Sequence, residues 1–247
     1  MRTRERRYDE LVGEAANAPI VGWEFSWLDG RADGSDPSWS FPALARPLLR
    51  RAGSLLDLDT GGGELLAEFA PLPAHTVAVE TWPRNIAVAR DRLRPYGVSV
   101  LTELPAGEDE FDLVLSRHGR LPAEDIARLL KPGGTLLTQQ VGSDDLAGLN
   151  QALDAPPPHL GRWNAGVAVA ALEAAGLEVV DVREEWPVFA FHDVGAVVYQ
   201  LRAVPWQVRD FDLGRYDRNL RRLDAVIRTR GTFTAYAHRF LIEARRA

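Results

Sequence analysis

At residues 54–64 the chain reads Ser54-Leu-Leu-Asp-Leu-Asp-Thr-Gly-Gly-Gly-Glu64. The run from Leu55 to Leu58 is short, apolar and bounded by glycines, which is typical of a buried parallel strand. The three glycines lead into Glu64-Leu-Leu-Ala-Glu-Phe69, whose composition favours a helix. A strand, a glycine turn and a helix in this order let backbone approach a ligand without interference from Cβ atoms. The stretch therefore predicts a nucleotide-type ligand site.

A second apolar run, Thr76-Val-Ala-Val-Glu80, places a carboxylate 23 positions after Asp57. Because Glu80 would close the next parallel strand, its carboxylate can accept both hydroxyls of a ribose. A dinucleotide fingerprint would need Gly-x-Gly-x-x-Gly, and no glycine stands three positions after Gly63. Asp57 inside the first strand would repel a pyrophosphate but suits a ligand with a cationic end.

These residues resemble the first two motifs of the class I S-adenosylmethionine-dependent methyltransferases. Asp57, Gly61 and Gly63 match the pattern Asp-x-Gly-x-Gly-x-Gly, whereas Asp59 replaces its first glycine. The segments Glu110 to His118 and Leu129 to Gln140 are similar to the fourth strand of that family and to the turn into its fifth. Four such segments in order are more specific than one glycine turn. The resemblance implies S-adenosyl-L-methionine as cofactor.

The resemblance also implies roles for individual residues. Asp57 and the backbone around Gly61 and Gly63 would face the amino acid end of the cofactor, and Glu80 would bind its ribose. Asp59 could repel the cofactor carboxylate or accept a hydrogen bond from its ammonium group. Glu80 could instead be an exposed acid that caps the next helix. The other expected cofactor contacts are Thr81, Trp82, Thr102, Glu103 and Ser116, although Trp82 could equally be a packing residue.

Strands that alternate with helices predict an α/β fold, a doubly wound, mostly parallel, Rossmann-like sheet. Helical cap elements are expected at the N-terminus and in a long insertion before the last strand. The expected division is an N-terminal helix and aromatic segment (1–52), a methyltransferase core (53–185 with 232–247) and a helical cap insertion (186–231). Expected helices include residues 3–17 and a helix capped by Asn164. The last strand is expected over 237–244.

Composition excludes several classes of protein. The chain of 247 residues has 29 basic and 35 acidic side chains, which argues against nonspecific binding of nucleic acid. It has no cysteine, so disulfides and thiolate nucleophiles are excluded. No apolar stretch reaches membrane-spanning length and no secretion signal is present, so a cytoplasmic protein is expected. Oligomerisation is not indicated by the sequence.

Five histidines are available if a general base is needed. His118 is the first candidate because it ends the fourth strand, and His192 is the second because aromatic residues and Asp193 surround it in the sequence. Either could also be a cap or loop residue. His238 is expected to be packed and hydrogen-bonded, and His75 and His159 to lie on the surface. No histidine pair has metal-ligand spacing, so no metal is expected.

Four large aromatic residues in irregular segments are candidates for the acceptor pocket: Trp27, Phe189, Phe191 and Trp206. Each could instead pack within the cap. The expected function is methyl transfer to a small organic acceptor. Methylation of RNA is the first alternative, because six arginines lie between 215 and 230, although a solvated helix face explains them as well. A catalytically inactive protein of the same fold that binds a ligand or partner is the second.

Overall fold

The computed structural model describes residues 7–20, 25–158 and 161–247, which fall into two compact units. The large-sheet unit comprises Pro37–Gly142, Trp163–Glu185 and Arg239–Ala247. The small-sheet unit comprises Ser143–Arg162, Trp186–His238 and the residues up to Asp36, in each case as far as they are described. Each unit has its own hydrophobic core, so each is described separately.

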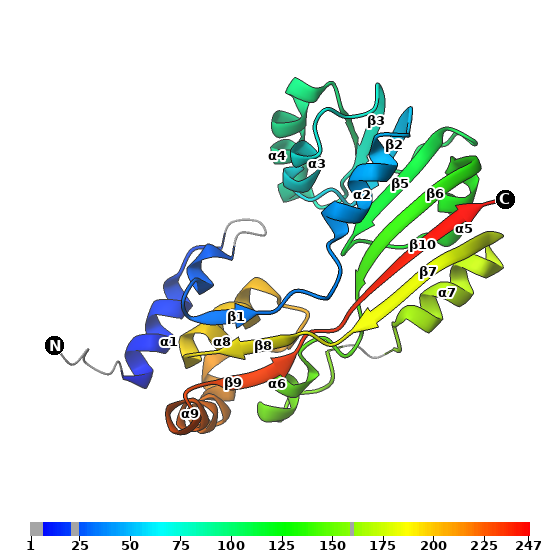
Figure 1. Cartoon of the computed structure of the whole chain (residues 1–247). Coiled ribbons are helices and arrows are strands. Elements are labelled where there is room, and N and C mark those ends of the chain that lie inside the picture. Colours follow the sequence, from blue (N-terminus) through cyan, green and yellow to red (C-terminus); the bar gives the residue numbers. More distant parts are fainter. Residues whose placement is uncertain (1–6, 21–24, 159–160) are drawn as a thin grey trace. The chain divides into compact units, whose positions relative to one another are not determined.

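The large-sheet unit contains a seven-stranded sheet in the order β4-β3-β2-β5-β6-β10-β7 (Figure 1). Strands β2 to β6 are parallel, and only β10 runs antiparallel, between β6 and β7. The expected doubly wound, mostly parallel sheet is therefore confirmed. Its strands are β2 (Ser54–Leu58), β3 (His75–Val79), β4 (Ser99–Leu101), β5 (Phe111–Arg117), β6 (Leu130–Val141), β7 (Leu177–Glu185) and β10 (Arg239–Arg246).

Helices cover both faces of this sheet because successive strand residues point to opposite sides. Leu56 and Leu58 of β2 pack in one cluster with apolar residues of α5 and α7. Leu55 packs in a second cluster with residues of α2, α3 and α4. The helices of the unit are α2 (Phe41–Leu49), α3 (Glu64–Glu68), α4 (Pro83–Leu93), the 3₁₀ turn η2 (Arg94–Tyr96), α5 (Ala123–Leu129) and α7 (Ala165–Ala174).

The small-sheet unit packs helices around a three-stranded antiparallel sheet in the order β1-β8-β9. Its core includes the fully buried side chains of Phe191, Val197 and Leu220. Its elements are α1 (Tyr8–Asn17), the 3₁₀ turn η1 (Ser26–Leu28), β1 (Ala32–Gly34), α6 (Ala147–Ala152), β8 (Val188–Phe191), α8 (Val194–Ala203), α9 (Leu213–Arg230) and β9 (Phe233–Tyr236).

The two units differ from the division expected from the sequence. The expected N-terminal segment 1–52 is split near Asp36, because Trp39 and Phe41 are buried in the core of the large sheet. The segment 143–162 belongs to the small-sheet unit, where Leu149 of α6 is buried. The expected helical insertion 186–231 also contains strand β8, which pairs with β9 beyond residue 231. These differences arise because side-chain packing and the pairing of β8 with β9 join segments that are distant in the sequence.

Several local expectations are confirmed. The Asn164 side chain accepts a hydrogen bond from the Val167 amide at 2.9 Å and caps α7. The N-terminal helix is present as α1, although residues 3–6 of the expected span lie outside the described residues, as does His159. The last strand begins at Arg239, two residues later than expected. In the described ranges, every helix is too short or too polar to span a lipid bilayer.

Candidate functional site

The candidate site lies at the carboxyl ends of β2, β3 and β5. Strand β2 pairs with β3 on one side and with β5 on the other, because the chain runs from β2 through β3 to β4 and then crosses back to form β5. Such a switch point opens a crevice outside the carboxyl ends of the strands, where α/β sheets bind their ligands. The side chains and turns that follow these three strands therefore decide what the site can hold.

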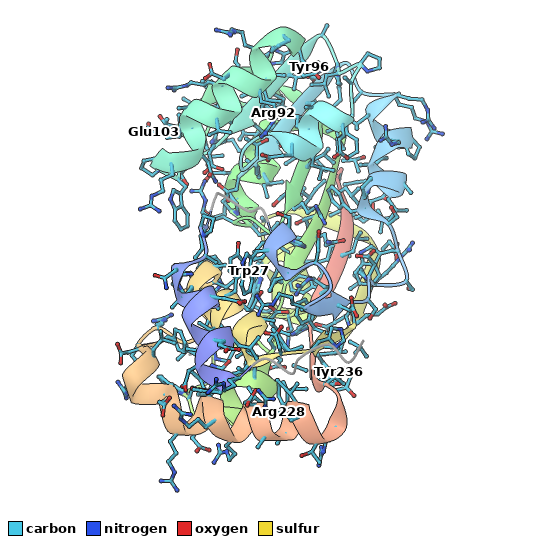
Figure 2. All side chains as sticks on the ribbon, turned by 90° about the vertical axis from the view of Figure 1, so that its left-hand side faces the viewer. Trp27, Arg92, Tyr96, Glu103, Arg228 and Tyr236 are labelled. Atoms are coloured by element: carbon cyan, nitrogen blue, oxygen red, sulfur yellow. The ribbon has the colours of Figure 1, made fainter. Side chains whose placement is uncertain are left out.

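The glycine turn after β2 has a backbone that only glycine adopts easily. Gly61 and Gly63 have φ values of 65° and 79°, in the left-handed region. A Cβ atom on Gly63 would lie 2.8 Å from Cγ of Leu93, so the turn packs directly on α4. Arg92 of α4, labelled in Figure 2, donates to the Gly62 carbonyl oxygen at 2.5 Å and pairs with Glu64. These contacts hold the turn in place.

Asp59 occupies the position where the family pattern has its first glycine, and its φ of 53° explains that preference. Aspartate is among the residues that tolerate this conformation. Its carboxylate accepts hydrogen bonds from the Arg120 guanidinium at 2.7 to 3.1 Å and from the Arg120 backbone amide at 2.6 Å. The Asp59 side chain is only 17% exposed. The ion pair thus joins the turn after β2 to the loop after β5 and neutralises the added carboxylate.

Gly119 makes this approach of the two loops possible. A Cβ atom at Gly119 would lie 2.7 Å from Cβ of Asp59 and 2.8 Å from its Oδ2. Neither Gly119 nor Arg120 was selected from the sequence, since Asp59 lies 61 positions before Arg120. The signal that could have found them is the unmatched acid at 59, which requires a cation or donors nearby.

Asp57 lies on β2 and is half-buried. Burial raises the pKa of the Asp57 carboxyl to about 7, and the negative charges of Asp59 and Glu80 act in the same direction. Removal of a carboxylate from water disfavours its charged form unless a cation compensates it. The ionised form of Asp57 is therefore unfavourable in the free protein, and a ligand with a cationic group would stabilise it.

Glu80 directly follows β3 and is 4% exposed. Its Oε1 accepts a hydrogen bond from the Trp82 backbone amide at 2.6 Å. The carboxylate is therefore buried and organises the turn before α4, rather than being the exposed cap considered from the sequence. Because a carboxylate has about four acceptor positions, Glu80 retains capacity for a diol.

The remaining expected cofactor contacts fall into two groups. Thr81, Thr102 and Glu103 are exposed, as is Trp82 with 45% of its surface, so all four can meet a ligand. Ser116 is fully buried, and its hydroxyl lies 3.3 Å from the Arg120 carbonyl oxygen, to which it donates. Ser116 thereby supports the loop after β5 from within.

His118 directly follows β5 and lies in the left-handed region, with a φ of 63°. Its backbone amide donates to the Gln139 carbonyl oxygen at 2.7 Å, and its ring Nε2 lies 2.9 Å from Nε2 of Gln139. Although the residue is exposed, desolvation of the ring lowers its pKa to about 3, and the charges of Arg117 and Arg239 contribute. A ring held neutral in this way is a poor proton acceptor at neutral pH.

His192 lies in the small-sheet unit, just after β8. Its Nε2 is 2.6 Å from Oδ2 of Asp33, which follows from the pairing of β1 with β8. The sequence had suggested Asp193 as the acid that influences this ring. Asp193 instead caps α8 through the Ala196 amide and forms two hydrogen bonds with Arg31. Half-buried His192 and exposed Asp33 thus form a pair, which the sequence did not indicate because the two residues are 159 positions apart.

The four aromatic candidates for an acceptor pocket all belong to the small-sheet unit. Trp27, labelled in Figure 2, stacks on Tyr199 with ring centroids 4.7 Å apart. Phe191 is fully buried and Phe189 packs beside it, with centroids 4.9 Å apart. Trp206 is half-buried. Trp27 and the two phenylalanines thus have packing roles, and fully buried Phe191 offers no surface to an acceptor. Contact of Trp27, Phe189 and Trp206 with an acceptor stays a prediction.

The arginine-rich helix α9 does not present a continuous cationic face. Arg215, Arg221, Arg222 and Arg228 each form an ion pair with an aspartate. The apolar side of the same helix, including Leu220 and Ile227, is buried. The charges are therefore those of a solvated outer face, as the sequence also allowed.

Comparison with known proteins agrees with this geometry. The profile of a family described as a methyltransferase domain matches residues 40–182. This chain belongs to the class I S-adenosylmethionine-dependent methyltransferases. S-adenosylmethionine is therefore the cofactor to consider at this site. Its diol and its cationic amino acid end suit buried Glu80, the glycine turn and the uncompensated Asp57.

Individual relatives are similar over part of their length. A ubiquinone biosynthesis O-methyltransferase from Cereibacter sphaeroides is 34% identical over 38% of this chain and 43% of its own length. A ubiquinone/menaquinone biosynthesis C-methyltransferase from Klebsiella pneumoniae is 29% identical over 45% of this chain and 52% of its own. This methyltransferase thus spans about half of each of these two relatives.

Among solved structures, the YcgJ protein from Bacillus subtilis has a similar fold. The TM-score is 0.60 at 16% identity, and the match covers 83% of this chain and 97% of that chain. At this identity the likeness concerns the fold alone.

Proposed function

We propose that this methyltransferase transfers a methyl group from S-adenosylmethionine to a small organic acceptor. The observation that carries the proposal is the presence of two acids, Asp57 and Glu80, beside the glycine turn at the switch point, where burial and the neighbouring negative charges raise the pKa of Asp57. A cofactor with a sulfonium and an ammonium group compensates this charge. When bound, that cofactor supplies an activated methyl group, so the protein needs chiefly to orient the acceptor and exclude water.

The residues of the large-sheet unit have distinct roles in this proposal. Glu80 binds the ribose hydroxyls, and the backbone at Gly61 and Gly63 accommodates the amino acid end. Asp57 faces the cationic group of that end. Thr81, Trp82, Thr102 and Glu103 lie toward the adenine, while Ser116 acts indirectly through the loop after β5. Asp59 is already paired with Arg120 and therefore does not repel the cofactor carboxylate.

The nature of the acceptor rests on two observations. The relatives named above are O- and C-methyltransferases of ubiquinone biosynthesis, which supports a small organic acceptor without choosing between oxygen and carbon. The ion-paired arginines of α9 give no support to the alternative of RNA methylation. The third alternative, an inactive ligand-binding protein of this fold, is separated from an enzyme only by experiment.

Binding of the cofactor is tested by calorimetry with S-adenosylhomocysteine. Glu80→Gln retains an oxygen for the Trp82 amide but loses the charge offered to the ribose. We expect weaker binding by ~1.5–3 kcal/mol, the worth of a hydrogen bond to a charged group. Glu178→Gln on β7 is the control, because Glu178 is an exposed acid of the same unit. Equal affinities in both variants, or tighter binding of NAD, would contradict the cofactor assignment.

Methyl transfer itself is tested with a methyl-labelled cofactor and a panel of phenols, enolisable carbonyl compounds, amines and total RNA. Label in a small product supports the proposal, whereas label in RNA alone favours the first alternative. Cofactor binding without transfer to any member of the panel favours the inactive alternative. Mass spectrometry of ligands released by denaturing the purified protein adds candidates to the panel.

A further inference from the structure

Three side chains of the large-sheet unit, those of Trp39, Gln139 and His118, form a chain of hydrogen bonds. Trp39 Nε1 lies 2.8 Å from Oε1 of Gln139, and Nε2 of Gln139 lies 2.9 Å from Nε2 of His118. Trp39 and Gln139 are each 5% exposed, so water does not replace either contact cheaply. Trp39 precedes α2 and Gln139 belongs to β6, so the chain of bonds is anchored at two places in the large-sheet unit.

The indole of Trp39 decides which way the Gln139 amide points. An indole N–H can only donate a hydrogen bond, so the group that faces it must be the amide oxygen. The reversed amide would place two donors against each other and leave both buried groups unsatisfied, at a cost of about 1–3 kcal/mol each. The amide nitrogen of Gln139 therefore faces His118.

The amide nitrogen in turn decides the tautomer of His118. Because that nitrogen can only donate, Nε2 of the ring must be the acceptor and cannot carry a proton. The proton of the neutral ring is then on Nδ1. Desolvation of the ring, together with the positive charges of Arg117 and Arg239, lowers the pKa of His118, which agrees with a ring that stays neutral.

The backbone of His118 adopts a conformation that is energetically unfavourable for a nonglycine residue. A nonglycine residue with φ of 63° costs of order 1 kcal/mol and persists where the surroundings enforce it. Here the enforcing contact is the 2.7 Å hydrogen bond from the His118 amide to the Gln139 carbonyl oxygen. Main chain and side chain of Gln139 thus hold the same histidine at the carboxyl end of β5, where the residue is exposed.

We propose that His118 is a fixed hydrogen-bond donor, which offers Nδ1–H to an oxygen atom of the methyl acceptor, and that Trp39 and Gln139 are positioning residues that maintain its tautomer. This inference rests on the proposed function. It assigns the acceptor to molecules with a carbonyl, carboxylate, phenol or enol oxygen. His118 then binds and orients the acceptor instead of removing its proton, which differs from the general-base role for which the sequence made it a candidate.

The tautomer is tested by long-range ¹H–¹⁵N correlation spectra of the ¹⁵N-histidine-labelled protein, with His118→Asn to assign the signals. We expect a proton on Nδ1 only and no titration of His118 between pH 5 and 8. Gln139→Glu places a carboxylate against Nε2, so the proton should move to Nε2 and a titration should appear in that range. A parent ring that carries its proton on Nε2, or that titrates near pH 6.5, would overturn the proposal.

Two further variants separate positioning from general stability. Trp39→Phe removes the indole donor and retains an aromatic ring, so the amide can turn and His118 should become a mixture of tautomers. Ser54→Ala alters another buried polar side chain of the same unit and should leave the tautomer unchanged. If Trp39→Phe is folded and keeps Nδ1–H alone, Trp39 is not a positioning residue.

Ligand binding is tested by adding benzoate, phenol and acetylacetone to the protein saturated with S-adenosylhomocysteine, with toluene as the control. At least one of the three oxygen compounds should shift the Nδ1–H signal, and toluene should not. If none shifts it, the assignment of an oxygen-bearing acceptor is wrong. Failure of cofactor binding is measured separately by calorimetry, so it is distinguishable from failure of this inference.

Discussion

At the scale of single residues, the site is shaped by charge. Asp57, Asp59 and Glu80 lie in or directly after strands that the sequence already indicates, yet their carboxylates have different partners. Asp59 is neutralised by Arg120, Glu80 holds a backbone amide, and only Asp57 is left with a strongly raised pKa. The negative charge that Asp59 adds to the family's glycine pattern is therefore balanced by Arg120. Asp57 is the acid whose ionised form a cationic ligand would stabilise.

Asp57 makes the stability of the free protein depend on pH. Its pKa is about 7 in the folded protein and 3.8 ordinarily, so the folded state binds more protons between these values. The favourable contribution is complete below about pH 4 and is lost as the pH rises through 7. Asp57→Asn cannot ionise, so we expect its melting temperature relative to the parent protein to increase from pH 5 to pH 8. A difference that is constant over this range would show that Asp57 is ionised throughout.

At the scale of elements, the turn between β2 and α3 depends on its packing against α4. Gly63 meets Leu93 from one side, and Arg92 bonds the carbonyl oxygen of Gly62. Both contacts come from the last turn of α4, and this helix begins at Pro83, three residues after Glu80. The glycine turn and the ribose-binding acid are thus linked through one helix.

Gly63→Ala tests this packing, with Gly97→Ala as a matched control. Both glycines have φ near 75°, so both substitutions carry a backbone cost of about 1–2 kcal/mol. A Cβ atom at Gly97 meets no atom within 4 Å, whereas one at Gly63 meets Leu93. We expect Gly63→Ala to lower the free energy of unfolding more than Gly97→Ala does, and to weaken cofactor binding as well. If denaturant unfolding shows the same decrease in the free energy of unfolding for both variants, the Leu93 side chain adjusts to the added methyl group without an energetic penalty.

At the scale of the whole molecule, the chain divides its residues between two units with separate cores. The residues assigned to the cofactor all belong to the large-sheet unit, and the four aromatic candidates for acceptor selection belong to the small-sheet unit. His192 with Asp33 also belongs to the latter. Variants in one unit can therefore be examined without altering the core of the other.

Trp27→Ala and Trp206→Ala should leave the affinity for S-adenosylhomocysteine unchanged and abolish methylation of an acceptor found in the panel. Trp27 stacks on Tyr199, so Trp27→Phe, which retains an aromatic ring, is the control for lost packing. Calorimetry and methyl transfer are measured on the same preparations. If both alanine variants unfold, or both methylate at the parent rate, these residues are structural and acceptor selection lies elsewhere.

Local sequence was enough to place the strand, glycine turn and helix from Ser54 to Phe69, the acid at Glu80 and the cap at Asn164. These features depend on hydrophobic periodicity, on positive φ angles and on hydrogen bonds between near neighbours. The partners of Asp59 and of His118 could not be derived in this way. They lie 61 positions away for Arg120 and 21 for Gln139, and Trp39 lies another 100 positions from Gln139. The order of strands in the sheet brings Arg120 and Gln139 to their partners, and the packing of the segment before α2 brings Trp39 to Gln139. This proximity sets the ion pair of Asp59 and the tautomer of His118. The division of the chain into two cores likewise depends on packing between distant segments, which the local sequence does not reveal.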